Sequence, residues 1–158
     1  MNSNYLKSLR IIYFALAMGI VLFMLVSLLI NNLNGALAES DISGVQKAPF
    51  LIVLVVMTGG IFMVYKTIFP KKLETIKLLP TLDRKLAAWR ELNVLKGALI
   101  EAPAFFATVL FMLLGVYALL VWPVAGLAVF WLSQPTRERL IIEANLSPNE
   151  IIEFDALA

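Results

Sequence analysis

The sequence predicts an all-α membrane protein, a bundle of four transmembrane helices with both termini cytoplasmic and short amphipathic cytoplasmic helices. Of its 158 residues, 61% are hydrophobic and 15% are charged, and the mean hydropathy is +0.88. A soluble domain is about 45–50% apolar and about 25% charged. Long apolar segments and an uneven distribution of basic residues along the chain complete the evidence. We treat residues 1–158 as a single membrane domain.

Two separate apolar segments occupy the first half of the chain. Residues 11–30 carry no charge, and residues 49–69 carry only Lys66. A transmembrane helix needs roughly 20 mostly apolar residues, so each segment predicts one span. The sequence Ala36-Leu37-Ala38 resembles a signal-peptidase site, but the apolar stretch before it is longer than the roughly 7–15 residues of a signal peptide. We therefore interpret the first segment as a retained helix.

A third apolar segment is long enough to cross a membrane twice. Residues 97–131 carry no charge except Glu101, and the stretch is too long for one ordinary span. We predict a third helix over residues 95–114 and a fourth over residues 118–133. The turn between them falls either at Gly115 with Tyr117 or at Trp122-Pro123.

The basic residues predict how the bundle is oriented. Residues 31–48 contain Lys47 as their only basic residue, whereas the other 12 of the 13 Lys and Arg residues fall in segments that a four-span map places on the opposite side. Basic residues concentrate on the cytoplasmic side of a membrane. We therefore expect a multi-pass protein of the bacterial inner (cytoplasmic) membrane, with N- and C-termini cytoplasmic. A nucleic-acid partner is not expected, because the basic residues adjoin membrane ends.

The segment between the second and third spans predicts an amphipathic helix over residues 81–95. We expect Pro70 to end the preceding helix and Thr81 to be an N-cap. The apolar positions at helical spacing are Leu86, Trp89, Leu92 and Leu95. This helix either lies on the bilayer surface or runs directly into the third span. Lysines at positions 71, 72 and 77 favour anionic lipids of the lipid bilayer as partners.

The cytoplasmic tail, residues 134–158, predicts two short helices. The first follows Pro135-Thr136. The second begins with Ser147 as N-cap, Pro148 at the first helical position and Glu150 completing a capping box. Its apolar residues are Ile151, Ile152 and Phe154. They are too apolar for a solvated tail, so we expect them to pack on the bundle or on a partner.

One candidate polar site lies inside the third span. A carboxylate within a membrane is expensive, so Glu101 is expected to be paired, protonated or turned to the bundle interior. Pro103 removes a backbone donor and leaves a carbonyl one turn earlier without its helical partner. Lys66, near the cytoplasmic end of the second span, could pair with Glu101. The open alternatives are a structural contact, an ion or proton site, and a partner-binding role.

The segment Ala98-Leu-Ile-Glu-Ala-Pro-Ala104 resembles the carboxylate helix of rotary-ATPase proteolipid subunits. That resemblance implies that Glu101 binds a transported proton or sodium ion. The Glu-Ala-Pro-Ala segment and the Gln-Pro-Thr exit from the last span also resemble small bacterial four-helix integral membrane proteins. This second resemblance implies a structural class and no activity.

Small residues predict close helix packing at three places. Pairs of small residues spaced four apart allow helix backbones to approach. The candidate positions are Ala15, Gly19, Gly59, Gly60, Ala98 and Ala102. They serve packing within one chain, or contacts in a homo-oligomer or a larger membrane complex.

The composition narrows the possible chemistry. The chain contains neither Cys nor His, which removes the usual thiolate and imidazole ligands and the commonest general base. A single intramembrane acid does not provide the paired carboxylates of an aspartyl protease. We expect no enzymatic activity, no catalytic residues, no metal and no cofactor. The predicted function is a non-catalytic accessory or scaffolding subunit of a membrane complex, and the alternative is an ion- or proton-coupled translocation element using Glu101.

Overall fold

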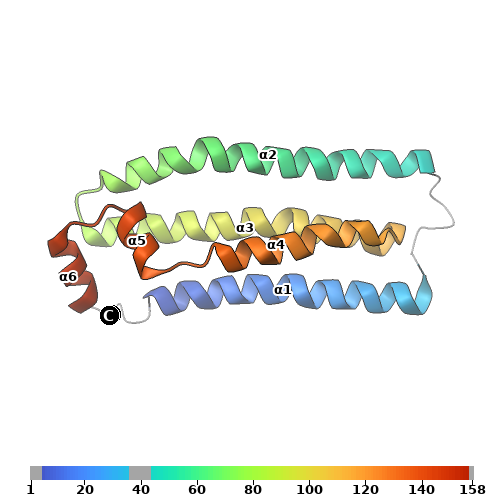
Figure 1. Cartoon of the computed structure of the whole chain (residues 1–158), viewed down its shortest axis with the longest axis horizontal. Helices are drawn as coiled ribbons and strands as arrows, with labels where there is room; N and C mark the ends of the chain where they lie inside the picture. The colour runs from blue at the N-terminus through green and yellow to red at the C-terminus, as the bar shows by residue number, and fades with distance from the viewer. Residues whose placement is uncertain (1–4, 36–43, 157–158) are drawn as a thin grey trace.

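The computed structural model describes residues 5–35 and 44–156, and within these ranges every regular element is helical (Figure 1). The elements are α1 (Tyr5–Asn34), α2 (Gly44–Lys77), α3 (Leu82–Leu114), the 3-10 helix η1 (Tyr117–Leu120), α4 (Val121–Leu132), α5 (Arg137–Glu143) and α6 (Pro148–Ala156). The predicted all-α class is therefore confirmed.

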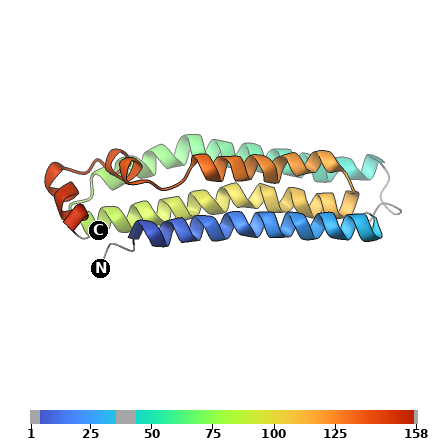
Figure 2. The ribbon, with the colours of Figure 1, turned by 60° about the horizontal axis from the view of Figure 1, so that its bottom comes forward.

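Four of these helices run side by side along the long axis of the molecule, each opposite in direction to the one before it (Figure 1). Helices α5 and α6 cover one end of the bundle, which we call the cap end. Helix α1 begins and α6 ends at this same end (Figure 2). The opposite end, where α3 turns into η1, is the hairpin end. The ends of the described chain thus lie together.

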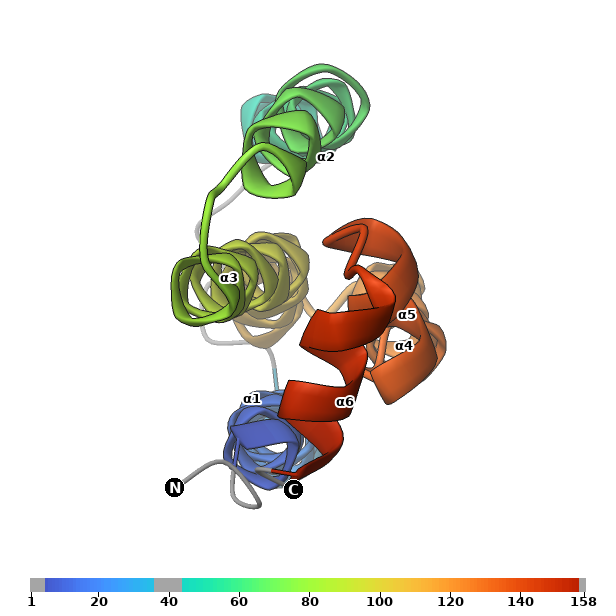
Figure 3. The ribbon, with the colours of Figure 1, turned by 90° about the vertical axis from the view of Figure 1, so that its left-hand side faces the viewer.

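Helix α3 is the centre of the bundle. It packs against α1, α2 and α4, and α1 also packs against α4. Viewed from the cap end, α3 separates α1 from α2, and α4 lies to one side (Figure 3). In the most apolar 18-residue stretch of α3, 39% of the residues are buried, whereas in that of α2 only 6% are buried. Helix α2 is therefore attached to the rest of the bundle through one narrow face.

Three helices, α1, α2 and α3, are long and apolar enough to cross a membrane. They contain the predicted spans 11–30, 49–69 and 95–114. The predicted span 118–133 corresponds to η1 and α4 together, which with α5 make a pair bent by 81° and would be the fourth span if counted as one. The chain thus has the composition and helix lengths of a membrane protein.

The turn at the hairpin end uses Gly115. This residue has φ 67°, in the left-handed region, and its N–H donates to the Phe111 carbonyl at 2.8 Å. Glycine is favoured there because it lacks a Cβ. The alternative turn at Trp122-Pro123 is wrong, since both residues lie in the first turn of α4.

The prediction that Pro70 ends the second helix is also wrong. Helix α2 continues through Pro70 to Lys77. Proline removes only one backbone hydrogen bond, and buried side chains hold the helix on both sides of it, Phe69 before and Ile76 after. Tertiary packing therefore outweighs the local penalty.

The predicted amphipathic segment 81–95 is continuous with the predicted third span, because α3 runs unbroken from Leu82 to Leu114. This is one of the two alternatives that the sequence left open. Thr81 is the N-cap of α3. The buried face differs from the predicted one, because Leu95 is exposed and polar residues take buried positions. These residues are Lys85, Asn93 and Lys96. Their burial is possible because other parts of the chain supply partners for them.

Both predicted tail helices are present at the cap end. In the capping box of α6, the Ser147 N–H donates to Glu150 Oε2 at 2.7 Å and the Glu150 N–H donates to Ser147 Oγ at 3.3 Å. Phe154 is buried against the ring of Tyr5, with centroids 6.5 Å apart. Ile152, however, is 68% exposed, so its predicted packing within the chain is wrong.

Candidate functional site

The predicted intramembrane acid, Glu101, faces helix α1. Its Oε1 lies 3.5 Å from the position that a Cβ on Gly19 would occupy, and the Phe105 ring lies beside it at 3.6 Å from the same position. The side chain is half-buried at the edge between α1 and α3. Within the described ranges, no group hydrogen-bonds or ion-pairs with it. The carboxylate therefore lies in van der Waals range of the α1 backbone at Gly19, where a Cβ would also fit.

The structure does not bring Lys66 to Glu101. Lys66 is exposed on α2, with its Nζ 5.7 Å from the centroid of the Phe62 ring. Its neighbour Tyr65 lies level with Lys96 of α3, and Glu101 is five residues further along that helix, or about 7.5 Å. The two residues differ in depth, and Glu101 lies on the face of α3 that is turned toward α1, whereas Lys66 lies on α2.

The small residues predicted for packing mostly lie outside the helix contacts. Ala15, Ala98 and Ala102 are exposed, and a Cβ on Gly59 or Gly60 would meet nothing within 4 Å. Gly19 alone among the predicted positions approaches another helix, at Glu101.

The close approaches are made by glycines that the spacing rule missed. A Cβ on Gly97 would come within 2.9 Å of Leu16 Cδ1, and a Cβ on Gly126 would lie 3.3 Å from the Ala104 Cβ. These positions bring α3 against α1 and α4. They were missed because each is a single glycine without a small residue four positions away on the same face.

A groove runs along the bundle between α2 and α4, with α3 as its floor. Its volume is about 390 Å³, within the range of roughly 300–1,000 Å³ for ligand sites. Helices α2, α3 and α4 contribute mainly apolar side chains. They include Ile61, Phe62, Leu99, Pro103, Ala125 and Val129. Pro103 therefore belongs to this groove, on a different side of α3 from Glu101.

A hydrogen bond links the walls of the groove toward the hairpin end. Trp122 Nε1 of α4 donates to Thr58 Oγ1 of α2 at 3.1 Å. This contact ties α2 to α4 where few other contacts join them. This hydrogen bond therefore marks the end of the groove nearest the hairpin end of the bundle.

Lys96 lies at the cap end of the groove. Its ammonium nitrogen is 5.4 Å from the centroid of the Tyr65 ring, and the residue is only 9% exposed. In residues 5–35 and 44–156, the three ion pairs are Lys77–Glu74, Lys85–Glu150 and Arg137–Asp155. Lys96 thus has an aromatic face as its neighbour and no carboxylate within ion-pair distance.

An acidic side chain does lie near this lysine. Glu143 and Lys96 both line a cavity of about 120 Å³ that adjoins the groove through Tyr65 and Phe69. The Glu143 carboxylate accepts a hydrogen bond from Trp89 Nε1 at 2.7 Å. Glu143 is therefore held by α3, and it leaves the Lys96 ammonium without a direct ion pair.

The sequence contained a signal for Lys96 that charge counting obscured. Counted with the basic residues between the spans, Lys96 is one of many interfacial lysines. By helical position it follows Leu92 by four residues, on the buried face of α3. An ionisable residue on the buried face of a helix suited to cross a membrane marks a candidate functional site.

The groove and its lysine are suited to binding. The chemistry available is one cation, the hydroxyl groups of Thr58, Tyr65 and Ser133, and an apolar channel. Comparison of the chain with protein-family models, with curated proteins and with solved structures gave no match. The structure is that of an all-helical protein with three helices suited to cross a membrane.

Proposed function

We propose that this chain is a non-catalytic accessory or scaffolding subunit of a bacterial inner-membrane complex, and that the outer face of α2 binds a transmembrane helix of another subunit. The observation that carries the proposal is the isolation of α2. This helix is the least buried of the three long helices, although it is as long as α3. A helix attached through one face has most of its surface available to a partner.

The outer face of α2 has the pattern of a helix–helix contact. Ile52, Val56 and Met63 are each more than 60% exposed, and with Gly59 they follow the spacing i, i+4, i+7 and i+11. Contact with lipid alone would be satisfied by any apolar side chain. A glycine in the middle of the stripe, with open space over it, instead lets a second helix backbone approach closely.

The proposed orientation has α4 as the fourth span and places the cap end in the cytoplasm. It is supported by the basic residues, which gather on segments of the cap end. The test uses single cysteines at Thr75 and Tyr117, which lie near opposite ends of the bundle, and an impermeant thiol reagent on intact cells. Labelling at position 117 alone is expected, and labelling at position 75 alone would contradict the orientation.

Site-specific crosslinking tests the partner-binding function. A photo-crosslinking residue at Met63 on α2 is expected to join the chain to one defined membrane protein or to a second copy. Val124 on α4 is also more than half exposed, and it provides the matched control. Crosslinks of equal yield and identity at both positions would contradict a specific role for α2.

A second function, ion- or proton-coupled translocation, is favoured by the surroundings of Glu101. Its half-buried carboxylate lies against Gly19 without a hydrogen-bond partner among the described residues, and carboxylates at membrane depth mark ion pathways. Purified protein in proteoliposomes would then carry a proton flux that Glu101→Gln abolishes. Equal flux in protein-free vesicles and in vesicles with the wild type would contradict this function.

A further inference from the structure

The groove between α2 and α4 combines a cation at one end with an apolar channel. Lys96 occupies the cap end, where the Tyr65 ring and the hydroxyl of Ser133 also lie. The remaining lining is almost entirely apolar. The arrangement has the polarity of a lipid, with one charged end and one hydrocarbon end.

We propose that this groove binds one anionic phospholipid, with its phosphate at Lys96 and one acyl chain between α2 and α4. The proposal rests on the membrane location put forward above and is independent of the partner that binds α2. It differs from general attraction of lipid to surface lysines, because it assigns one defined position to one lipid.

The charge of Lys96 is complementary to that of a phosphate group. A cation buried without a paired anion is destabilising, because its lost hydration is not replaced. The Tyr65 ring replaces part of that hydration through its negative face. A phosphate oxygen would replace the rest, and basic pockets between transmembrane helices on the cytoplasmic side bind lipid headgroups.

The open side of the groove explains why the occupant is a lipid. Helix α2 lies on one side of α3 and α4 on an adjacent side (Figure 3), and few contacts join α2 to α4, so the channel between them opens laterally toward the surrounding bilayer. An acyl chain can enter from that side. A water-soluble anion would gain nothing from the apolar walls formed by Phe62, Leu99 and Val129.

Neighbouring charges set the selectivity. Glu143 is the acidic residue that shares a cavity with Lys96, and its carboxylate accepts a hydrogen bond from Trp89 and forms no ion pair with Lys96. The exposed Lys66 lies on α2 one position after Tyr65. A zwitterionic headgroup would bring its own cation to this lysine-rich end, so an anionic headgroup is preferred.

Lipid titration of the purified full-length protein tests the proposal. Dioleoylphosphatidylglycerol and dioleoylphosphatidylcholine are added in a neutral detergent, and bound lipid is counted by native mass spectrometry. One phosphatidylglycerol molecule is expected to remain bound in preference to phosphatidylcholine. The variant Lys96→Met should weaken that binding by about tenfold or more, as expected for the loss of one hydrogen bond to a charged group.

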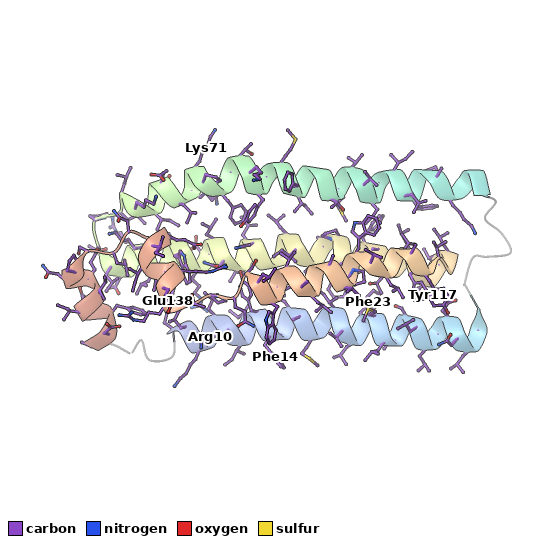
Figure 4. All side chains as sticks on the ribbon, in the orientation of Figure 1. Arg10, Phe14, Phe23, Lys71, Tyr117 and Glu138 are labelled. Carbon is purple, nitrogen blue, oxygen red and sulfur yellow. The ribbon has the colours of Figure 1, made fainter. Side chains whose placement is uncertain are left out.

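Three matched variants separate the site from nonspecific effects. Lys71 points away from the bundle (Figure 4), so Lys71→Gln should leave lipid binding unchanged. Lys96→Arg should retain the preference because it keeps the charge. Ala125→Phe fills the apolar channel and should weaken phosphatidylglycerol binding while Lys96 is intact, which provides a test even if Lys96→Met fails to fold.

Inorganic phosphate is the final arm of the test. Equal stabilisation by inorganic phosphate and by phosphatidylglycerol would assign the site to a free anion and overturn the proposal. Equal binding of the two lipids, or full binding by both Lys96→Met and Ala125→Phe, would also overturn it. These outcomes leave crosslinking through α2 unaffected, so failure here is distinguishable from failure of the proposed function.

Discussion

Lys85 of α3 and Glu150 of α6 form an ion pair with Nζ 2.9 Å from Oε1, although 65 residues separate them in the sequence. The Lys85 side chain is buried on the central helix, and Glu150 also accepts the Ser147 N–H of the capping box. One carboxylate therefore both begins α6 and fastens it to α3. This contact holds the cap end closed over the bundle.

A double-mutant cycle should detect this link. Lys85→Met or Glu150→Gln alone is expected to reduce the free energy of unfolding by about 2 kcal/mol, between the values for exposed and buried pairs. The double variant should lose less than the sum, because the second change no longer strands a charge. Thermal unfolding in detergent measures all four proteins. The exposed Arg137–Asp155 pair is the control, and strict additivity at Lys85 and Glu150 would contradict the link.

The carboxyl groups of α6 should also make the free energy of unfolding depend on pH. Partial burial raises the pKa of Glu150, but hydrogen bonds from the Ser147 backbone and Lys85 outweigh it and hold that pKa below its ordinary value of 4.5. The Arg137 guanidinium likewise lowers the pKa of Asp155. On acidification the unfolded chain takes up protons before the folded chain does, so stability should decrease below about pH 5.

This pH dependence can be assigned by mutation. Stability of the wild type is measured by thermal unfolding between neutral and acidic pH, with Glu150→Gln in parallel. The variant should be less stable at neutral pH and should show a shallower decrease in acid. Parallel curves for the two proteins would mean that Glu150 does not contribute.

Two glycines of the bundle should respond oppositely to added side chains. Gly97→Val is expected to destabilise the protein by roughly 1–3 kcal/mol, because its Cβ would come within 2.9 Å of Leu16 Cδ1 and 3.6 Å of the Phe130 ring, and its two methyl groups would need further space there. Gly59→Ala meets open space, so it should be neutral or stabilising, since alanine favours the helix over glycine. Melting temperatures of the isolated chain measure both. A destabilising Gly59→Ala beside a tolerated Gly97→Val would contradict the described packing.

Glu101 and Lys66 should behave as independent residues. They lie on different helices and at different depths, so the effects of Glu101→Gln and Lys66→Met on stability should add to within about 0.5 kcal/mol. Thermal unfolding of both single variants and the double variant measures this. Recovery of stability in the double variant would instead show that the two charges are coupled.

The sequence predicted the ends of the helices better than it predicted their neighbours. Thr81 as N-cap, the capping box at Ser147 and a turn at Gly115 are local signals, and each lies where the sequence predicted it, although the Thr81 side chain makes no capping hydrogen bond. The pairing of Glu101 with Lys66 was inferred from similar depth alone. Hydropathy gives the depth of a residue, but the neighbour of each helix face depends on contacts between distant segments.

Local sequence also failed to predict the burial of two lysines on α3. Lys85 and Lys96 lie on the buried face of α3 by helical position, yet their burial depends on Glu150 of the tail and Tyr65 of α2. Local polarity predicts an exposed position for a lysine, whereas a distant partner reverses that preference. The continuation of α2 beyond Pro70 also depends on contacts between distant segments. Burial of Phe69 and Ile76 offsets the free-energy cost of the lost backbone hydrogen bond.

The proposed binding of a partner helix to the outer face of α2 is tested most directly by native mass spectrometry of the protein extracted from membranes in a mild detergent. The wild type is expected to be found in one complex of defined stoichiometry, with a second copy or another membrane protein. Gly59→Leu, which places bulk in the open space over α2, should release the chain from that complex, whereas Ala15→Leu on the exposed face of α1 should not. A wild type that is monomeric under these conditions, or a complex that survives Gly59→Leu intact, would contradict the binding of a partner through α2.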